Sequence, residues 1–498
     1  MGIIARQSLA NAVYTYTGIG LGALLTLFLY PTILDPDQYG LTRVLISASI
    51  IGSQFAHLGM RNTVIRFFPL FHRTGGSHSG LLFLALIVPM AGYILFLLLF
   101  FLFDDLLLSL YRERSPLLND HALLILPITF FILYFEVLNS YLRSFRDSTT
   151  GSLISEVILR IAVILSLGGY LMEWVSFNGF LILFTSAYAL QPLLLLGKLV
   201  RTGRFNPSLT PTLLKRPLLR GMARYGLFTL FGGLTTVVVW NVDVLMVSSM
   251  IGLEATAVYA IAFYIGTVIA VPQRAIERIA TPLISEFIHE KRWKEVERIY
   301  RRTSLTQLIA GCSILLLVWS NTVPMLRLLP DVYHGGHWVV LIIGLGKLID
   351  MATGVNGSII LTSKHYRFDL LANLMLILFT VSSNLILIPR LGIEGAALAT
   401  AFSLLLYNLI KFLFVRHTWS MSPFGPAHLL VVAAGLVTFG VLHLLPELPL
   451  WGHLPLTILL TGLLFLLPVH LFRLSPDLSR ALDPLLPKWF GPNHQNRP

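Results

Sequence analysis

Long apolar segments recur fourteen times in this 498-residue sequence and constrain its fold more than any other feature. A helix needs about 20 mostly apolar residues to cross the hydrocarbon core of a bilayer. Only 12% of the residues are charged, against about a quarter in a soluble domain. The sequence therefore predicts an all-α polytopic membrane protein. The expected spans lie near residues 8–30, 41–60, 80–103, 121–142, 152–171, 178–198, 222–242, 256–273, 304–325, 337–360, 369–389, 394–415, 427–445 and 453–472.

The distribution of positive charge predicts the orientation of these spans. If the N-terminus lies inside, 29 of the 36 lysines and arginines fall in inner segments and four in outer ones. The other three, Arg43, Arg160 and Lys347, lie within spans. Since Lys and Arg are retained on the cytoplasmic side, both termini are expected to be cytoplasmic. The same asymmetry explains the net charge of +12 without a nucleic-acid partner.

A basic connector separates two halves that echo each other. Residues 198–224 carry seven lysines or arginines and no acidic residue. Short outer turns at 34–41 and 251–258 occupy equivalent places in the two halves, about 216 positions apart. Repeated halves are typical of transporters whose substrate site lies between them. We expect an N-terminal lobe at 1–200, the connector at 201–221, a C-terminal lobe at 222–416, two further spans in 417–472 and a cytoplasmic tail at 473–498.

Polar residues follow one face of the second expected span. Arg43, Ser47, Gln54, His57 and Arg61 recur at intervals that keep one side of a helix. An ionisable group inside a span is costly and is therefore a functional candidate. The stripe suits the wall of a watery cavity that receives an anionic, hydroxyl-rich ligand. Alternatively, the two arginines extend to the two interfaces, and the glutamine and histidine bind neighbouring helices.

The tenth expected span carries Lys347 and Asp350 near its middle, on one face with Gly354 and Ser358. One interpretation is a self-neutralised pair within the helix. The other is a cation that binds phosphate, beside an acid that releases the phosphate or couples its movement to a proton. We therefore treat both residues as candidates for the substrate cavity.

Other intramembrane charges are candidates for ion coupling or for helix contacts. Glu156 and Arg160 have the spacing of a helical ion pair. For Glu136 and Glu156 a structural contact between helices is favoured, whereas Arg160 lies deeper and stays a substrate-binding candidate. Asp243 is either an interface residue or a cation site.

The long inner loop at 283–302 alternates apolar and basic residues. This pattern predicts an amphipathic helix on the inner leaflet, with its cations toward anionic headgroups. A structural role at the surface is favoured over a specific lipid site.

The signatures of enzymes are missing from the sequence. It has no phosphate-binding glycine-rich loop with a lysine, no His-Glu-x-x-His and no Gly-x-Ser-x-Gly. Its single cysteine, Cys312, rules out a disulfide within the chain. We therefore expect no catalytic residue, no metal site and no cofactor, with coupling to H⁺ or Na⁺ left open.

Several short stretches resemble one family of bacterial transporters. They are 11–18 (NAVYTYTG), 29–31 (LYP), 37–40 (DQYG), 59–61 (GMR) and 65–69 (IRFFP). Together they resemble the start of bacterial polysaccharide transporters, the O-antigen-type flippases of the multidrug/oligosaccharidyl-lipid/polysaccharide exporter superfamily. The fourteen expected spans and the six-plus-six repeat agree with that family over the whole length.

This resemblance implies two helical lobes around a cationic cavity in the bacterial inner membrane. It implies transfer of an undecaprenyl-pyrophosphate-linked oligosaccharide to the outer leaflet by alternating access, driven by an ion gradient or the membrane potential. Other proteins of polysaccharide assembly are implied as partners. Three alternatives stay open: a cation-coupled drug antiporter of the same fold, a membrane enzyme acting on the same lipid, and a scaffold of envelope assembly.

Overall fold

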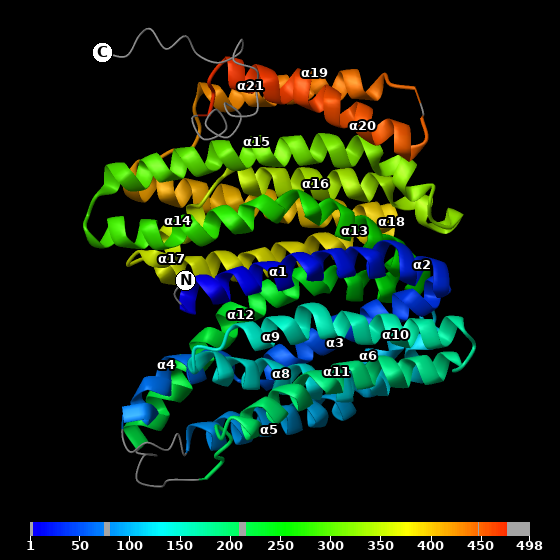
Figure 1. Ribbon diagram of the computed structural model, residues 1–498, viewed down its shortest axis with the longest axis vertical. Coiled ribbons are helices and arrows are strands. Elements are labelled where there is room, and N and C mark those ends of the chain that lie inside the picture. Colours follow the sequence, from blue (N-terminus) through cyan, green and yellow to red (C-terminus); the bar gives the residue numbers. More distant parts are fainter. Residues whose placement is uncertain (1–2, 74–79, 209–215, 447, 476–498) are drawn as a thin grey trace. The chain divides into compact units, whose positions relative to one another are not determined.

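The computed structural model describes residues 3–73, 80–208, 216–446 and 448–475, and these ranges are helical and contain no strand (Figure 1). Contacts divide the chain into two compact units, Met1–Ala260 and Ile261–Pro498. We call them unit 1 and unit 2. The predicted lobe boundaries at 201–221 and 416 concern the sequence repeat and stay a prediction.

Unit 1 contains the helices up to α12 and the first half of α13. Their bounds are α1 (Ile3–Ala23), η1 (Leu24–Leu29), α2 (Tyr30–Ile33), α3 (Pro36–Ala56), α4 (Met60–Arg73), α5 (Leu81–Leu102), α6 (Asp104–Ser109), α7 (Pro116–His121), η2 (Ala122–Leu124), α8 (Ile125–Ser144), α9 (Thr149–Leu153), η3 (Ile154–Ile158), α10 (Leu159–Leu171), α11 (Phe177–Arg201), α12 (Arg216–Met250) and α13 (Leu253–Thr267).

Unit 2 contains the rest of α13 and all later helices. Their bounds are η5 (Val268–Ala270), α14 (Val271–His289), α15 (Trp293–Leu326), η6 (Asp331–Gly336), α16 (His337–Ala352), α17 (Asn356–Thr362), α18 (Tyr366–Trp419), α19 (Pro426–His443), α20 (Leu450–Thr461), η7 (Gly462–Leu466) and α21 (Leu467–Leu471).

The helices agree with the polytopic fold expected from the apolar segments. Within the described ranges, eleven helical segments are long and apolar enough to cross a membrane, and α12, which bends by 47°, is a twelfth. The 54-residue α18 contains two expected spans, because its backbone leaves helical geometry at Gly392 (φ 63°, ψ −138°). The expected span at 41–60 corresponds to α3. About fourteen spans therefore describe the chain well.

Local sequence explains where α3 begins and ends. Asp35 and Gln38 form a capping box, in which the Gln38 side chain accepts from the Asp35 N–H at 3.2 Å, and Pro36 occupies the first turn. At the other end, Leu58 and Gly59 have positive φ values of 47° and 75°. This left-handed turn stops α3 and redirects the chain into α4.

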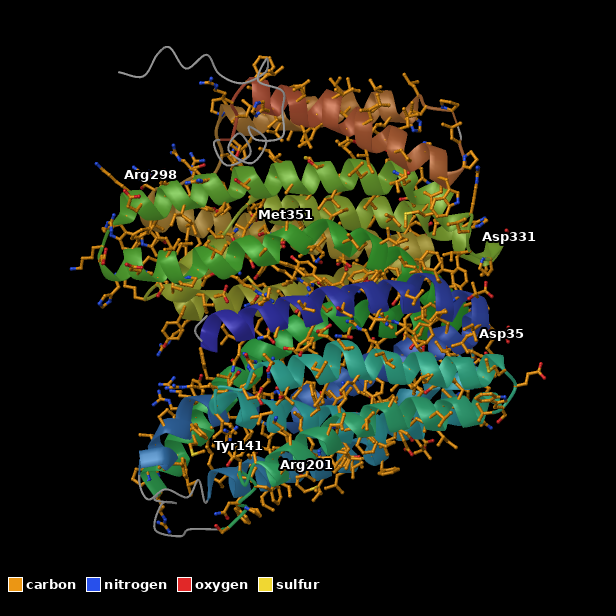
Figure 2. All side chains as sticks on the ribbon, in the orientation of Figure 1. Asp35, Tyr141, Arg201, Arg298, Asp331 and Met351 are labelled. Atoms are coloured by element: carbon orange, nitrogen blue, oxygen red, sulfur yellow. The ribbon has the colours of Figure 1, made fainter. Side chains whose placement is uncertain are left out.

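Each unit has its own apolar cores. In unit 1, α4, α5 and α8 contribute to a cluster that includes the fully buried Tyr141 (Figure 2). In unit 2, Cys312 of α15 packs with residues of α19 and with Phe465 of η7. The two C-terminal spans therefore form part of the core of unit 2.

The amphipathic surface helix expected at 283–302 is absent, and this expectation was wrong. The segment is instead the end of α14, a short turn and the start of α15. Its apolar residues Ile284, Val296 and Tyr300 are fully buried in a core cluster of unit 2. They alternate with cations because their apolar side chains pack into this cluster while the cations between them face outward.

Candidate functional site

The polar stripe predicted on the second span is interrupted in the structure. Arg43 and Gln54 lie on α3, His57 is its C-terminal cap, and Arg61 lies on α4 beyond the left-handed turn. A single helical face from Arg43 to Arg61 was therefore a wrong expectation. The sequence signal for the break was Gly59, because glycine favours positive φ.

Gln54 and His57 are buried and hydrogen-bonded to each other. His57 Nδ1 accepts from the Gly59 N–H at 2.9 Å, so its Nε2 carries the proton and donates to Gln54 Oε1 at 3.0 Å. A Cβ at Gly233 of α12 would lie 2.3 Å from Gln54 Nε2. These contacts fix the end of α3 against α12. They agree with the alternative in which Gln54 and His57 bind neighbouring helices.

Arg61 and Glu136 form an ion pair between α4 and α8. Arg61 Nε lies 3.2 Å from Glu136 Oε2, and both side chains are partly exposed. The pair neutralises both charges and joins two helices. This geometry matches the role in helix contacts favoured for Glu136.

Glu156 and Arg160 form the ion pair that their spacing predicted. Arg160 Nη2 lies 3.0 Å from Glu156 Oε2. The pair lies against α1, because a Cβ at Gly18 would be 2.6 Å from Glu156 Oε2 and one at Gly22 would be 3.2 Å from the Arg160 guanidinium. Glu156 belongs to the π-helical turn η3, and such turns are frequent at functional sites.

Two buried guanidinium nitrogens of unit 1 lack a hydrogen-bond partner among the described residues. They are Arg43 Nε and Arg160 Nη1. Both arginines lie within electrostatic range of Tyr188 of α11, which is buried. The structure therefore brings Arg43 and Arg160 to one buried tyrosine, and we call these three residues the cationic cluster. Tyr188 was missed because a tyrosine in a span carries no charge signal.

Asp243 lies in the interior of unit 1 and is 2% exposed. Its Oδ2 accepts a hydrogen bond from the Tyr259 hydroxyl at 2.8 Å. The residue is therefore buried inside the protein, and the choice between an interface residue and a cation site stays a prediction. Tyr259, on α13, was not a candidate from the sequence.

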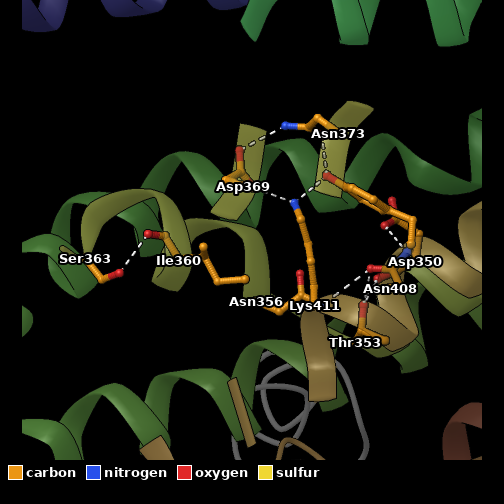
Figure 3. Close-up of polar contacts among 10 residues, drawn as sticks. Asp350, Thr353, Asn356, Ile360, Ser363, Asp369, Asn373, Asn408 and Lys411 are labelled. Atoms are coloured by element: carbon orange, nitrogen blue, oxygen red, sulfur yellow. Dashed lines mark hydrogen bonds and ion pairs between the residues drawn. The ribbon is translucent and has the colours of Figure 1, made fainter. Parts of the chain in front are cut away.

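In unit 2, Lys347 and Asp350 lie on α16, which ends at Ala352. The expected face shared with Gly354 and Ser358 is wrong, because Gly354 has a φ of 63° and breaks the helix. Lys347 is buried. Asp350 accepts from Asn408 Nδ2 at 2.8 Å (Figure 3). It also accepts from Gln273 Nε2 at 3.1 Å.

Gln273 places two carboxylates close together. Its Nε2 donates to Asp350 Oδ2 and to Glu277 Oε1, each at 3.1 Å. Two carboxylates that share one amide repel each other, and this repulsion favours uptake of a proton or cation between them. Glu277 was not a candidate from the sequence, because it lies beyond the inner end of the predicted span 256–273.

Lys411 is a further intramembrane cation that the charge count missed. It was assigned to an inner segment, yet it is 4% exposed and its Nζ lies 2.7 Å from Asp369 Oδ1. Lys411 also contacts the Tyr407 hydroxyl, which donates to Asn373 Oδ1 at 2.8 Å, and Asn373 in turn donates to Asp369 at 3.0 Å (Figure 3). The spacing of Tyr407, Asn408 and Lys411 on one helical face was an available signal.

Asn408, which follows Tyr407 in α18, belongs to a second hydrogen-bonded group that includes Asp350. Its Oδ1 accepts from Thr353 Oγ1 at 2.8 Å, while its amide donates to Asp350 (Figure 3). The two groups adjoin each other at Tyr407 and Asn408, and we call them together the polar network of unit 2. Its members are Gln273, Asn373, Tyr407, Asn408, Thr353, Glu277, Asp350, Asp369 and Lys411.

Comparison with known proteins shows which fold the chain shares. Residues 229–386 match the model of the MatE family. The structure of the lipid II flippase MurJ in an inward closed conformation matches 94% of this chain and 98% of its own, with a TM-score of 0.73 and 14% identity. The chain has the fold of the MOP-superfamily transporters. Comparison with curated protein sequences gives no match.

Multidrug transporters of the same fold are also similar. A MATE family transporter of the MOP superfamily in an inward-facing conformation matches 84% of this chain and 95% of its own, with a TM-score of 0.60 and 15% identity. The structure of a MATE in complex with MaL6 matches 83% of this chain and 96% of its own, with a TM-score of 0.51 and 13% identity. The MatE match and the fold agree with the superfamily expected from the first seventy residues, and the polysaccharide-transporter family itself stays a prediction. The chain is a multi-pass membrane protein with the fold of these transporters.

Proposed function

We propose that this protein is a flippase that moves a lipid-linked oligosaccharide with an undecaprenyl pyrophosphate from the cytoplasmic to the outer leaflet. The observation that carries the proposal is the cationic cluster of unit 1. Arg43 Nε and Arg160 Nη1 are buried donors without a partner among the described residues. Phosphate oxygens are strong acceptors for guanidinium groups, so a pyrophosphate is the class of ligand that these donors suit.

The extent of the structural matches supports a flippase over an antiporter. The match to the lipid II flippase covers 94% of this chain, against 84% for the inward-facing multidrug transporter. Unit 2 of this chain also incorporates α19–α21, the spans beyond the six-plus-six repeat, into its core.

The polar network of unit 2 suits the coupling of transport to H⁺ or Na⁺. Asp350 and Glu277 share one amide donor, so one cation or proton would relieve their repulsion. Transfer by alternating access in the bacterial inner membrane, with both termini cytoplasmic and with other polysaccharide assembly proteins as partners, belongs to the same proposal.

A cation-coupled multidrug antiporter is the second candidate. The MatE match at 229–386 and the acidic groups of unit 2 favour it. The two functions differ in the charge of the cargo, because a cationic drug would be repelled by Arg43 and Arg160.

Reconstituted liposomes distinguish the two. Purified protein is given a fluorescent lipid-pyrophosphate-linked oligosaccharide in one set and a cationic dye in another. The proposal predicts movement of the lipid, loss of that movement in Arg43→Gln, and normal movement in the control Arg201→Gln, at the exposed end of α11. Dye efflux without lipid movement would establish the antiporter instead.

A further inference from the structure

A cavity of about 430 Å³ lies in unit 2 where α15 meets the start of α19. Arginines of α15 form one side, and the linker before α19 with its first turn forms the other. Figure 2 shows Arg298 near the end of α15 that adjoins the turn from α14. The lining residues are Arg298, Arg301, Arg302, Leu305, Pro423, Phe424, Gly425, Pro426, Ala427, His428 and Ser475.

The arginine side of this cavity is accessible and partly fixed. The side chains of Arg298 and Arg301 are 71% and 60% exposed. They pair with Glu295 and Glu297 of the same helix, each at 2.7 Å, and Arg301 Nε donates to the Ser422 carbonyl at 3.1 Å. Exposed ion pairs within one helix are weak. An anion that binds both Arg298 and Arg301 can therefore replace the carboxylates of Glu295 and Glu297.

The opposite side of the cavity has no acidic residue among the described residues that line it. The first turn of α19 has no acidic residue. His428 Nδ1 accepts from the Gly425 N–H at 3.2 Å, which leaves its Nε2 to donate to Ser304 Oγ at 2.9 Å. These bonds assign a neutral imidazole and tie α19 to α15.

The remaining lining is apolar and favours a lipid over a free anion. Leu305, Pro423, Phe424 and Ala427 face the cavity. Inorganic phosphate gains nothing from these side chains, whereas the glycerol and first acyl carbons of a lipid bury apolar area against them. Because α15 continues from Arg298 as a candidate membrane span, its arginines lie at the depth of headgroups. Basic pockets between spans on the cytoplasmic side bind such headgroups.

We propose that this cavity binds the headgroup of an anionic phospholipid of the inner leaflet, with its phosphate at Arg298 and Arg301. The bound lipid would hold α19–α21 against α15. This specific site replaces the general surface role favoured for residues 283–302 from the sequence. The inference is independent of the transported substrate.

Binding of defined lipids to the delipidated full-length protein tests this site. Phosphatidylglycerol and phosphatidylcholine with the same acyl chains are titrated in detergent, and bound lipid is counted by native mass spectrometry. We expect phosphatidylglycerol to bind more tightly than phosphatidylcholine. The double variant Arg298→Gln/Arg301→Gln should weaken phosphatidylglycerol binding by about tenfold or more, because it loses charge-assisted hydrogen bonds. Inorganic phosphate is expected not to compete at millimolar concentration.

Two variants separate a specific site from general charge and from misfolding. Lys291→Gln/Lys294→Gln removes two exposed cations of the same inner segment outside the cavity, and phosphatidylglycerol binding should stay within about threefold of wild type, because exposed charges are screened. Arg301→Lys loses the Ser422 hydrogen bond yet keeps the charge, and it should bind. Equal losses in both double variants, equal binding of phosphatidylcholine, or competition by phosphate would each overturn the proposal.

Discussion

Unit 1 and unit 2 both bury cations inside the membrane region, but they neutralise them differently. In unit 2, Lys411 lies 2.7 Å from Asp369 and also contacts Tyr407. In unit 1, Arg43 Nε is buried without a hydrogen-bond partner among the described residues. Because a buried donor without an acceptor is costly, its retention points to a ligand. We therefore propose that unit 1 binds the ligand, whereas unit 2 compensates the charge of Lys411 internally and uses Asp350 and Glu277 for ion coupling.

The largest expected effect is on the stability of unit 2. Asp369→Asn leaves the buried ammonium of Lys411 without its carboxylate, and we expect the free energy of unfolding to fall by about 3–5 kcal/mol. Denaturant unfolding in mixed micelles measures this loss. Adding Lys411→Met should recover much of the stability. Glu295→Gln, at an exposed pair, serves as control, with a cost of about 0.2–1 kcal/mol. An equally small cost for Asp369→Asn would contradict the assigned role.

The second effect concerns ligand affinity in unit 1. Arg43→Gln should weaken binding of a soluble lipid-pyrophosphate analogue by about 10–100-fold, because it removes a charge-assisted hydrogen bond. Its unfolding free energy should change little, since Arg43 Nε has no partner to lose among the described residues. Isothermal titration and denaturant unfolding measure the two quantities. A large loss of stability with normal affinity would make Arg43 a structural residue.

A third prediction uses the glycines of α1. A Cβ at Gly18 would lie 2.6 Å from Glu156 Oε2, whereas one at Gly20 would meet nothing within 4 Å. Gly18→Ala should therefore destabilise the protein by about 1–3 kcal/mol through overpacking. Gly20→Ala should be neutral or stabilise it by up to about 1 kcal/mol. Equal unfolding midpoints for the two variants would show that α1 does not pack on the Glu156–Arg160 pair.

The smallest effect is expected at the partly exposed pair between α4 and α8. Arg61→Gln should cost about 0.2–1 kcal/mol of unfolding free energy, as exposed ion pairs do. It should leave affinity for the pyrophosphate analogue unchanged. A tenfold loss of affinity would return Arg61 to the ligand site and weaken the distinction between the cationic cluster and the structural pairs.

Much of the fold could be predicted because a bilayer demands long apolar helices. The expected spans correspond to helices of the structure, with α18 containing two of them. The breaks at Gly59 and Gly354 were harder to predict, since helical periodicity alone continues through them. Each break moved a candidate, Arg61 or Ser358, off the face expected for it.

The candidate site was only partly predictable because partners come from distant helices. The pair Glu156–Arg160 followed from local spacing. The contact of Lys411 with Asp369, and the bridge from Gln273 to Asp350, join residues 42 and 77 positions apart. Tertiary packing sets such contacts, and no local pattern encodes them. Charge counting also misplaced Lys411, because it lies near the inner end of its span.

Transport measured with and without an imposed ion gradient tests the division of roles between the two units most directly. The liposome assay follows the fluorescent lipid-linked oligosaccharide in wild type, Arg43→Gln, Asp350→Asn and the control Asp331→Asn, whose side chain is fully exposed. We expect Arg43→Gln to lose movement under both conditions, Asp350→Asn to lose only the stimulation by the gradient, and Asp331→Asn to behave as wild type. Gradient-stimulated transport that persists in Asp350→Asn, or normal movement in Arg43→Gln, would contradict the account.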